Sequence, residues 1–136
     1  VWNPLATERL KLYGANVIEG DLMQRNENED KVELATGDLS DLSIYDVVLS
    51  LPGYDVLYPG NRMSQLYEEI LDRSEVSFEK TAPPEATARG GYRRLLVEAR
   101  DLKCETFQEE REPHLLSARL SFDLPKGTYA TMMLRE

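Results

Sequence analysis

Apolar residues recur at helical spacing near the start of the chain. In the segment NPLATERLKLYG, Ala6, Leu10 and Tyr13 lie at positions i, i+4 and i+7 and therefore share one helical face. Asn3 is a candidate N-cap, and Gly14 is suited to close the last turn in a left-handed conformation. The pattern predicts a helix across this segment.

A second helix is predicted in the segment NRMSQLYEEILDR. Its apolar side chains fall at i, i+3, i+4, i+7 and i+8: Met63, Leu66, Tyr67, Ile70 and Leu71. One face of this helix is hydrophobic, whereas Glu68 and Glu69 lie on or near the solvent side. We interpret the apolar stripe as core packing rather than as a cofactor site.

Strict alternation marks the segment SARLSFDL as a β-strand. Ala118, Leu120, Phe122 and Leu124 share one face, and polar residues occupy the other. Shorter strand-like runs occur in ANVIEGDLM, in IYDVVLSL and twice in YRRLLVEARDLKCETFQEE, and turn-forming glycines and prolines separate them. Helices mixed with these strands predict an α+β fold, with a mostly antiparallel sheet and flanking helices.

The last predicted strand runs into a turn and the start of a helix. Pro125, Lys126 and Gly127 turn the chain, Thr128 is a candidate N-cap, and apolar residues follow at helical spacing. Tyr129 is therefore expected at a strand–helix corner, where its side chain can project into a cleft. The alternative is a core tyrosine that fills this corner.

Composition and charge bound the class of protein. With 136 residues, 41% hydrophobic and 30% charged, the chain is expected to form one globular domain with a sizeable core. The 25 acidic and 16 basic residues give a net charge of -9, which by itself argues against nucleic-acid binding. Four arginines in ARGGYRRLLVEAR nevertheless allow one basic face on an acidic body.

The sequence contains no targeting signal that we recognise. No apolar run reaches the roughly 18 residues that a membrane span needs, and the N-terminus lacks a signal-peptide pattern. The first residue is not methionine, which predicts a piece of a longer protein.

Few side chains suggest chemistry by themselves. Cys104 is alone, which excludes an internal disulfide and fits a reducing compartment; its strand-like setting predicts core packing rather than a catalytic thiol. His114 has no partners at metal or triad spacing, so we expect a surface or structural role. Asp38, Asp41 and Asp46 are expected to satisfy local backbone donors rather than to hold a metal.

The segment SFDLPKGTYATMMLRE resembles the closing motif of the TruD family of pseudouridine synthases, F-x-L-P-x-G-S/T-Y/F-A-T-x-x-x-R-E. Three earlier blocks are similar to family patterns in the same order: VWNPLATERLKLYGANVIEGDLM, then IYDVVLSLPGYDVLYP of the eukaryotic branch, then GGYRRLLVEARDL. Together the blocks extend from Trp2 to Glu136. The chain departs from the patterns at Pro4, just after Trp-Asn, and at Ser50, where proline is usual.

The resemblance implies a TruD-like pseudouridine synthase fold. Residues 1–116 would form part of the inserted TRUD domain, and residues 117–136 the last strand and the helix start of the catalytic domain. The implied activity is the isomerisation of uridine to pseudouridine in tRNA or another structured RNA, with no cofactor, no metal and no membrane. The implied location is intracellular, in the nucleus or the cytoplasm.

The family's nucleophile is an aspartate in an upstream Gly-x-x-Asp-type motif, and these 136 residues contain no such motif. Tyr129 matches the Tyr or Phe of the closing motif, which implies stacking on an extruded base beside the nucleophile. Extruding a base costs roughly a few kcal/mol, and stacking on an aromatic ring returns roughly 1–3 kcal/mol.

Four basic residues are candidates for RNA binding: Arg93, Arg94, Lys126 and Arg135. Guanidinium groups bind phosphates in a bidentate manner, although a structural ion pair explains each arginine equally well. Two other functions stay open. One is a non-catalytic RNA-binding or protein-interaction module that has kept the fold. The other is an acidic α+β interaction domain that shares the motifs by accident.

Overall fold

The computed structural model describes residues 2–25, 31–74, 78, 88–108 and 114–135. The chain divides into two compact units, Val1–Leu96 and Val97–Glu136, which are described separately. Both units combine helices with antiparallel strands, so the predicted α+β fold is confirmed. The predicted domain boundary between residues 116 and 117 falls inside the second unit and stays a prediction about the family's domains.

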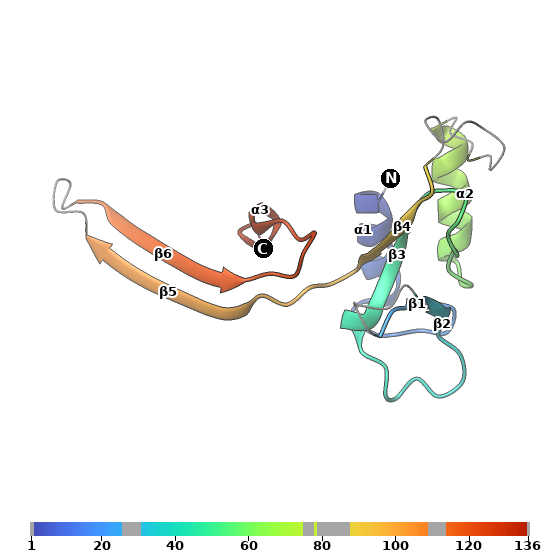
Figure 1. Cartoon of the computed structure of the whole chain (residues 1–136), viewed down its shortest axis with the longest axis horizontal. Coiled ribbons are helices and arrows are strands. Elements are labelled where there is room, and N and C mark those ends of the chain that lie inside the picture. Colours follow the sequence, from blue (N-terminus) through green and yellow to red (C-terminus); the bar gives the residue numbers. More distant parts are fainter. Residues whose placement is uncertain (1, 26–30, 75–77, 79–87, 109–113, 136) are drawn as a thin grey trace. The chain divides into compact units, whose positions relative to one another are not determined.

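The first unit is built around a four-stranded antiparallel sheet with the strand order β2-β1-β3-β4 (Figure 1). Its elements are α1 (Trp2–Tyr13), β1 (Leu22–Met23), β2 (Glu33–Leu34), a 3-10 helix (Ile44–Asp46), β3 (Val47–Leu51), α2 (Met63–Arg73) and β4 (Gly91–Arg94). α1 packs against β3, and α2 packs against α1.

The hydrophobic core of this unit centres on β3. The first four residues of β3 are all buried, and because successive side chains of a strand point to opposite faces, both faces of β3 are covered. Both helices and neighbouring parts of the sheet contribute to the core: Leu5, Ala6, Met23, Ala35, Val47, Leu49, Met63, Tyr67 and Leu95. The hydroxyl of Tyr67 donates to the carbonyl of Ser50 at 2.9 Å, and burial raises the pKa of Tyr67 well above its usual range.

A buried ion pair joins α1 to the start of β1. Arg9 is fully buried and donates from Nε to Asp21 Oδ1 at 3.0 Å and from Nη2 to Asp21 Oδ2 at 2.6 Å. The same guanidinium donates to the carbonyls of Gly14 and Asn16, at 3.1 and 2.7 Å, just beyond the end of α1. Asn61, ahead of α2, donates its side-chain amide to Asp21 Oδ1 at 3.2 Å. One carboxylate therefore holds both helices to the sheet.

Two loops meet closely through glycine backbones. The amide of Asp55 donates to the carbonyl of Arg89 at 3.0 Å, and the side chains of these two residues form an exposed ion pair at 2.9 Å. A Cβ atom at Gly53 would overlap the backbone of Arg89 and Gly90. At Gly90 the φ of +86° is in the left-handed region that favours glycine. The junction therefore requires glycine on both loops.

The second unit is a long β-hairpin followed by a short helix (Figure 1). β5 (Arg100–Gln108) pairs with the antiparallel strand β6 (Leu116–Asp123), and α3 (Ala130–Met133) comes after them. Near the start of β5, Asp101 has a φ of 52°, where a bulge shifts the register of the two strands. The strand predicted from the segment SARLSFDL is confirmed as β6.

The sequence located most elements but not every boundary. α1 begins at Trp2, ahead of the predicted cap Asn3, and Gly14 closes it at a φ of +60°, as predicted. A strand forms only after the predicted Gly20-Asp21 turn, as β1, and not before it. The predicted surface connection SEVSFEKTAPPEATARGG lies largely outside the described residues.

Replacing Asp21 with alanine is expected to lower the free energy of unfolding of the first unit by about 3–5 kcal/mol, because Arg9 would keep a buried charge without its partner. Native-state hydrogen exchange of the β1 and β3 amides measures this loss. Glu8→Ala is the matched control, since it breaks only the exposed pair with Lys11 at 2.8 Å, worth about 1 kcal/mol or less. Equal effects of the two substitutions would contradict the role given to the buried pair.

Gly53→Ala is expected to destabilise the first unit by about 1–3 kcal/mol, because the added Cβ displaces the backbone of Arg89 and Gly90. Gly91→Ala is its control, since nothing lies within 4 Å of the Cβ position there. Thermal unfolding should show a lowered midpoint for the first variant and a change of about 0.5 kcal/mol or less for the second. If Gly53→Ala unfolds at the same temperature as the wild type, the close approach of Gly53 to the backbone of Arg89 and Gly90 is ruled out.

Candidate functional site

A tight turn connects β6 to α3. The amide of Thr128 donates to the carbonyl of Pro125 at 3.2 Å, and Gly127, between them, has a φ of +84°. Glycine adopts this left-handed conformation without the strain that a side chain would add. The turn therefore depends on Gly127, and it brings Tyr129 to the start of the helix.

Tyr129 occupies the N-cap position of α3, with φ -101° and ψ 120°. Its carbonyl accepts the amides of Met132 at 3.0 Å and Met133 at 3.4 Å. Tyr129 is 61% exposed, so its ring does not fill the corner of this unit. The prediction that Thr128 caps the helix is wrong, because the extended residue from which the helix starts lies one position later.

Exposed basic and apolar side chains flank Tyr129 in the sequence. Lys126 in the turn and Arg135 after α3 are both exposed, as are Met132 and Leu134. An exposed aromatic ring suits stacking on a nucleobase, and lysine and arginine suit contact with phosphates. Three of the predicted site residues therefore belong to one short segment of the second unit.

Arg94 lies in the first unit, and its guanidinium is engaged there. It donates to the carbonyls of Tyr45 and Gln24, the latter at 3.3 Å, and lies 3.4 Å from a carboxylate oxygen of Asp46. The Arg94 side chain is only 16% exposed. These contacts join β4 to the 3-10 helix and to the end of β1, which favours the structural interpretation of Arg94.

Arg93, the neighbour of Arg94 on β4, contacts an aromatic ring. Its guanidinium carbon lies 5.3 Å from the centroid of the Trp2 ring, within range of a cation–π interaction. Because Trp2 belongs to α1, this contact fastens the helix to the sheet and leaves Arg93 half-buried. The RNA-binding role of both arginines stays a prediction.

The remaining candidate side chains have other roles in this chain. Cys104 is exposed, so the prediction that it packs in a core is wrong for these residues, because the two-stranded hairpin has no second layer of its own. His114 is exposed in a turn, which confirms its predicted place at the surface. Asp38 accepts the amide of Ser40 at 3.0 Å, and this hydrogen bond lowers the pKa of Asp38. Asp46 pairs with an arginine of β4 instead.

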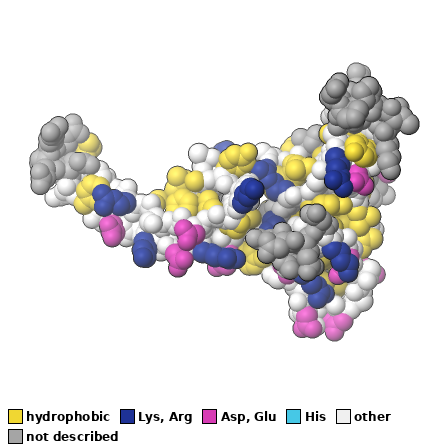
Figure 2. Space-filling model, viewed as in Figure 1, with side chains coloured by type: hydrophobic (Ala, Val, Ile, Leu, Met, Phe, Trp, Pro, Cys, Tyr) yellow, Lys and Arg dark blue, Asp and Glu magenta, His cyan; other side chains and the backbone are white. Residues whose placement is uncertain are grey.

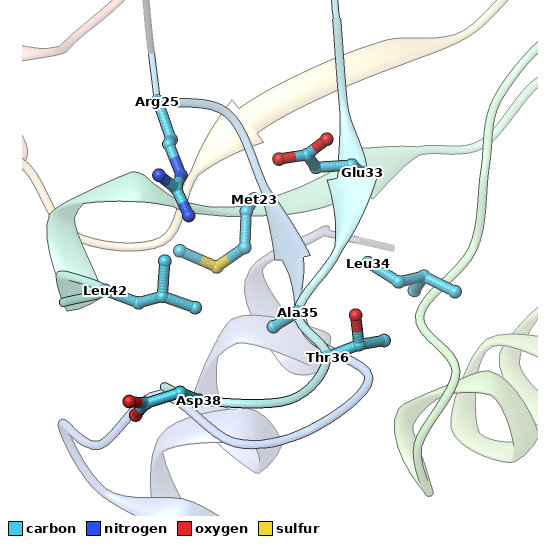
Figure 3. Close-up of a pocket in the computed structure, with 8 residues that line it drawn as sticks. All are labelled: Met23, Arg25, Glu33, Leu34, Ala35, Thr36, Asp38 and Leu42. Atoms are coloured by element: carbon cyan, nitrogen blue, oxygen red, sulfur yellow. The ribbon is translucent and has the colours of Figure 1, made fainter. Parts of the chain in front are cut away.

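A small pocket lies beside β1 and β2 in the first unit (Figure 3). It is lined by Met23, Arg25, Glu33, Leu34, Ala35, Thr36, Asp38 and Leu42. Its volume of about 190 Å³ is below the roughly 300–1,000 Å³ typical of small-molecule sites. Charges of both signs line it, and it contains none of the predicted site residues, so we assign it no ligand.

The described ranges contain neither a clustered metal-binding set nor a membrane-spanning helix. In those ranges, His, Cys, Asp and Glu side chains form no group of three or more that could hold a metal ion. Each helix in the same part of the chain is too short or too polar to cross a membrane.

The polar side chains that organise the first unit are not predicted by the sequence patterns. Arg9 and Asp21 form the buried pair, and the hydroxyl of Ser50 donates to the carbonyl of Leu57 at 2.6 Å. The Tyr92 hydroxyl accepts the amide of Leu57 at 2.7 Å. One signal was present: Arg9 lies three positions after Ala6 and four before Tyr13, so it shares the apolar helical face, where a solvent-facing charge is not expected. The departure from the family pattern at Ser50 also has a structural use, since its side chain fastens a loop.

Comparisons with known proteins cover the whole chain. The family model of TruD, tRNA pseudouridine synthase D, matches residues 1–136. "Pseudouridylate synthase 7 homolog" of Mus musculus is 28% identical over 161 residues, covering 100% of this chain and 24% of the relative. "Pseudouridylate synthase PUS7L" of Homo sapiens is 32% identical over 158 residues, covering 100% of this chain and 22% of the relative.

An archaeal relative matches a shorter part. "Probable tRNA pseudouridine synthase D" of Methanosarcina barkeri is 33% identical over 93 residues, which is 66% of this chain and 21% of the relative. The chain thus spans about a quarter of the length of the curated relatives it matches. Because the family model covers all of its residues, including the corner at Tyr129, the chain belongs to the TruD family of tRNA pseudouridine synthases.

Proposed function

We propose that the protein containing this chain converts uridine to pseudouridine in RNA and that these 136 residues supply the C-terminal part of the enzyme. The observation that carries the proposal is the family match over the whole chain, together with the exposed Tyr129 at the corner that the closing motif builds. tRNA is the first substrate to test, because the family description names it. The protein would act inside the cell, in the nucleus or the cytoplasm.

The reaction breaks the bond between the ribose and N1 of uracil and forms a new bond between the ribose and C5. The released base must turn within the site before it is rejoined, so the target uridine has to leave the base stack first. In the proposed enzyme an aspartate from another part of the polypeptide acts as the nucleophile. These residues contribute binding and positioning rather than the attacking group.

Tyr129 would hold the extruded uracil by stacking. Its ring is exposed, and its backbone at the N-cap is extended rather than helical. Lys126 and Arg135 lie a few residues away on either side and would contact phosphates that flank the target nucleotide. This arrangement would bind RNA by stacking and by charge, and it requires no metal and no cofactor bound by this chain.

Tyr129→Ala is expected to lower turnover by about 5- to 150-fold, the equivalent of the roughly 1–3 kcal/mol that stacking on an aromatic ring supplies. Tyr129→Phe should retain most of the activity, because it keeps the ring. Turnover can be followed by the release of tritium from tRNA labelled at C5 of uridine, since the new bond to C5 displaces that hydrogen.

Tyr54→Ala is the matched control, because Tyr54 is also exposed, at 37%, but belongs to the first unit. Full activity of Tyr129→Ala would remove the stacking role. A wild-type protein that binds tRNA but forms no pseudouridine in any RNA would favour the non-catalytic module instead.

Lys126→Ala and Arg135→Ala are each expected to weaken tRNA binding and to reduce the slope of log Kd against log salt concentration by about 1, the effect of one lost phosphate contact. Filter binding over a range of salt concentrations measures the slope. Lys11→Ala is the control, because Lys11 is an exposed lysine already paired with Glu8. An unchanged slope in both variants would show that neither side chain contacts phosphate.

A further inference from the structure

We propose that one face of the β5–β6 hairpin is an internal interface, covered in the whole protein by the polypeptide that lies outside these 136 residues. This face, called here the apolar hairpin face, comprises Cys104, Thr106, Gln108, Leu116, Ala118, Leu120 and Phe122. The identity of its occupant rests on the proposed function, whereas the existence of an unsatisfied apolar face does not.

The strand register defines the apolar hairpin face. Cys104 lies opposite Leu120, and Thr106 lies opposite Ala118. Residues directly opposite each other in an antiparallel pair point to the same side, and every second residue along a strand does so as well. The aliphatic and aromatic side chains of β6 therefore line up on the side of the hairpin that also carries Cys104.

The described residues leave this face open to solvent. Leu116 is 74% exposed and Leu120 is 43% exposed, while Phe122 is half-buried. Leaving a leucine in water forgoes roughly 1.5–3 kcal/mol of burial free energy. A single two-stranded hairpin is at best marginally stable in water and needs further strands or a helix on its hydrophobic face. The hairpin therefore has the pattern of strands taken from a larger layered structure.

The opposite face of the hairpin is suited to water. Lys103 and Ser121 lie opposite each other, and Glu105 lies opposite Arg119, with a nitrogen-to-oxygen distance of 4.0 Å between the latter two side chains. The guanidinium of Arg119 also lies 5.4 Å from the ring centroid of Phe107 and covers part of this aromatic ring. In Figure 2, positive and negative side chains alternate along one side of the hairpin. Charged and hydroxyl side chains therefore predominate on this face among the described residues, although Phe107 is 40% exposed there.

The rest of the same polypeptide is the occupant that the observations favour. The matching relatives are about four times as long as this chain, so most of their length lies elsewhere. In the proposed enzyme the nucleophile comes from that other part and must meet Tyr129, which follows β6 by only a few residues. Docking the apolar hairpin face on that part would fix the Tyr129 corner against it, whereas a second copy of this chain would not bring a nucleophile.

Cys104 provides a direct test in the full-length protein. We expect maleimide to label Cys104 at least about tenfold more slowly than a cysteine introduced by Ser121→Cys, since labelling of a covered thiol requires a local opening. Ser121 is exposed on the opposite face, so the two positions differ only in the side of the hairpin. Mass spectrometry of the peptides assigns each label, whatever other cysteines the protein contains.

Two further comparisons identify the occupant. Leu120→Lys should accelerate labelling of Cys104, because it places a charge in the interface, whereas Ser121→Lys should not. Protection of Cys104 should be independent of protein concentration. Protection that appears only as the protein dimerises would overturn the assignment to the same polypeptide.

The outcome separates this proposal from the proposed function. If Cys104 reacts as fast as the cysteine from Ser121→Cys while the protein still forms pseudouridine, the interface is refuted and the activity stands. If Cys104 is protected but no pseudouridine forms, the interface stands and the activity is refuted.

Discussion

The first unit depends on one buried ion pair, between Arg9 and Asp21. Burying two charges is costly unless nearly every donor and acceptor is used, and here the guanidinium serves both carboxylate oxygens and two backbone carbonyls. The carboxylate in turn accepts from the amide of Ile18 at 3.0 Å and from Asn61. The same pair therefore positions the end of α1, the turn before β1 and the start of α2. This helps to hold the two-residue strands β1 and β2 in the sheet.

The need to pair charges inside the fold also explains why the arginines of β4 differ from Lys126 and Arg135, which follow the hairpin. In the first unit the basic side chains near the sheet are used for internal contacts: Arg94 binds backbone carbonyls, and Arg93 covers the ring of Trp2. A guanidinium committed in this way stabilises the fold, and only a residue with exposed charge can gain free energy by releasing counterions from RNA. Lys126 and Arg135 meet that condition better, because both are exposed beside the Tyr129 corner.

Periodicity predicted the elements whose apolar residues in the sequence share one face. Both α2 and β6 form where the sequence places them; α2 buries part of its apolar face, whereas the apolar face of β6 is largely exposed in these residues. The sequence indicates that Arg9 lies on an apolar helical face but does not identify Asp21 as its partner, because the two residues are 12 positions apart and the energy comes from tertiary burial. The cap was predicted at Thr128 but lies at Tyr129, for a smaller reason: cap preference is worth about 1 kcal/mol, which the geometry of the preceding Gly127 turn can outweigh. The site role of Tyr129 is implied by the resemblance of the closing motif to the family and not by periodicity.

The burial predicted for Cys104 differs from its exposure in the structure. Its sequence setting, a small hydrophobic residue in a strand, predicts burial, yet it is exposed in these 136 residues. Both statements hold if the hairpin is completed by polypeptide outside this chain. If that polypeptide covers the apolar hairpin face, the alternation along β6 reflects a contact that these 136 residues do not make by themselves. In the proposed enzyme the exposed Tyr129 ring would face the substrate, and the exposed apolar hairpin face would contact the rest of the polypeptide.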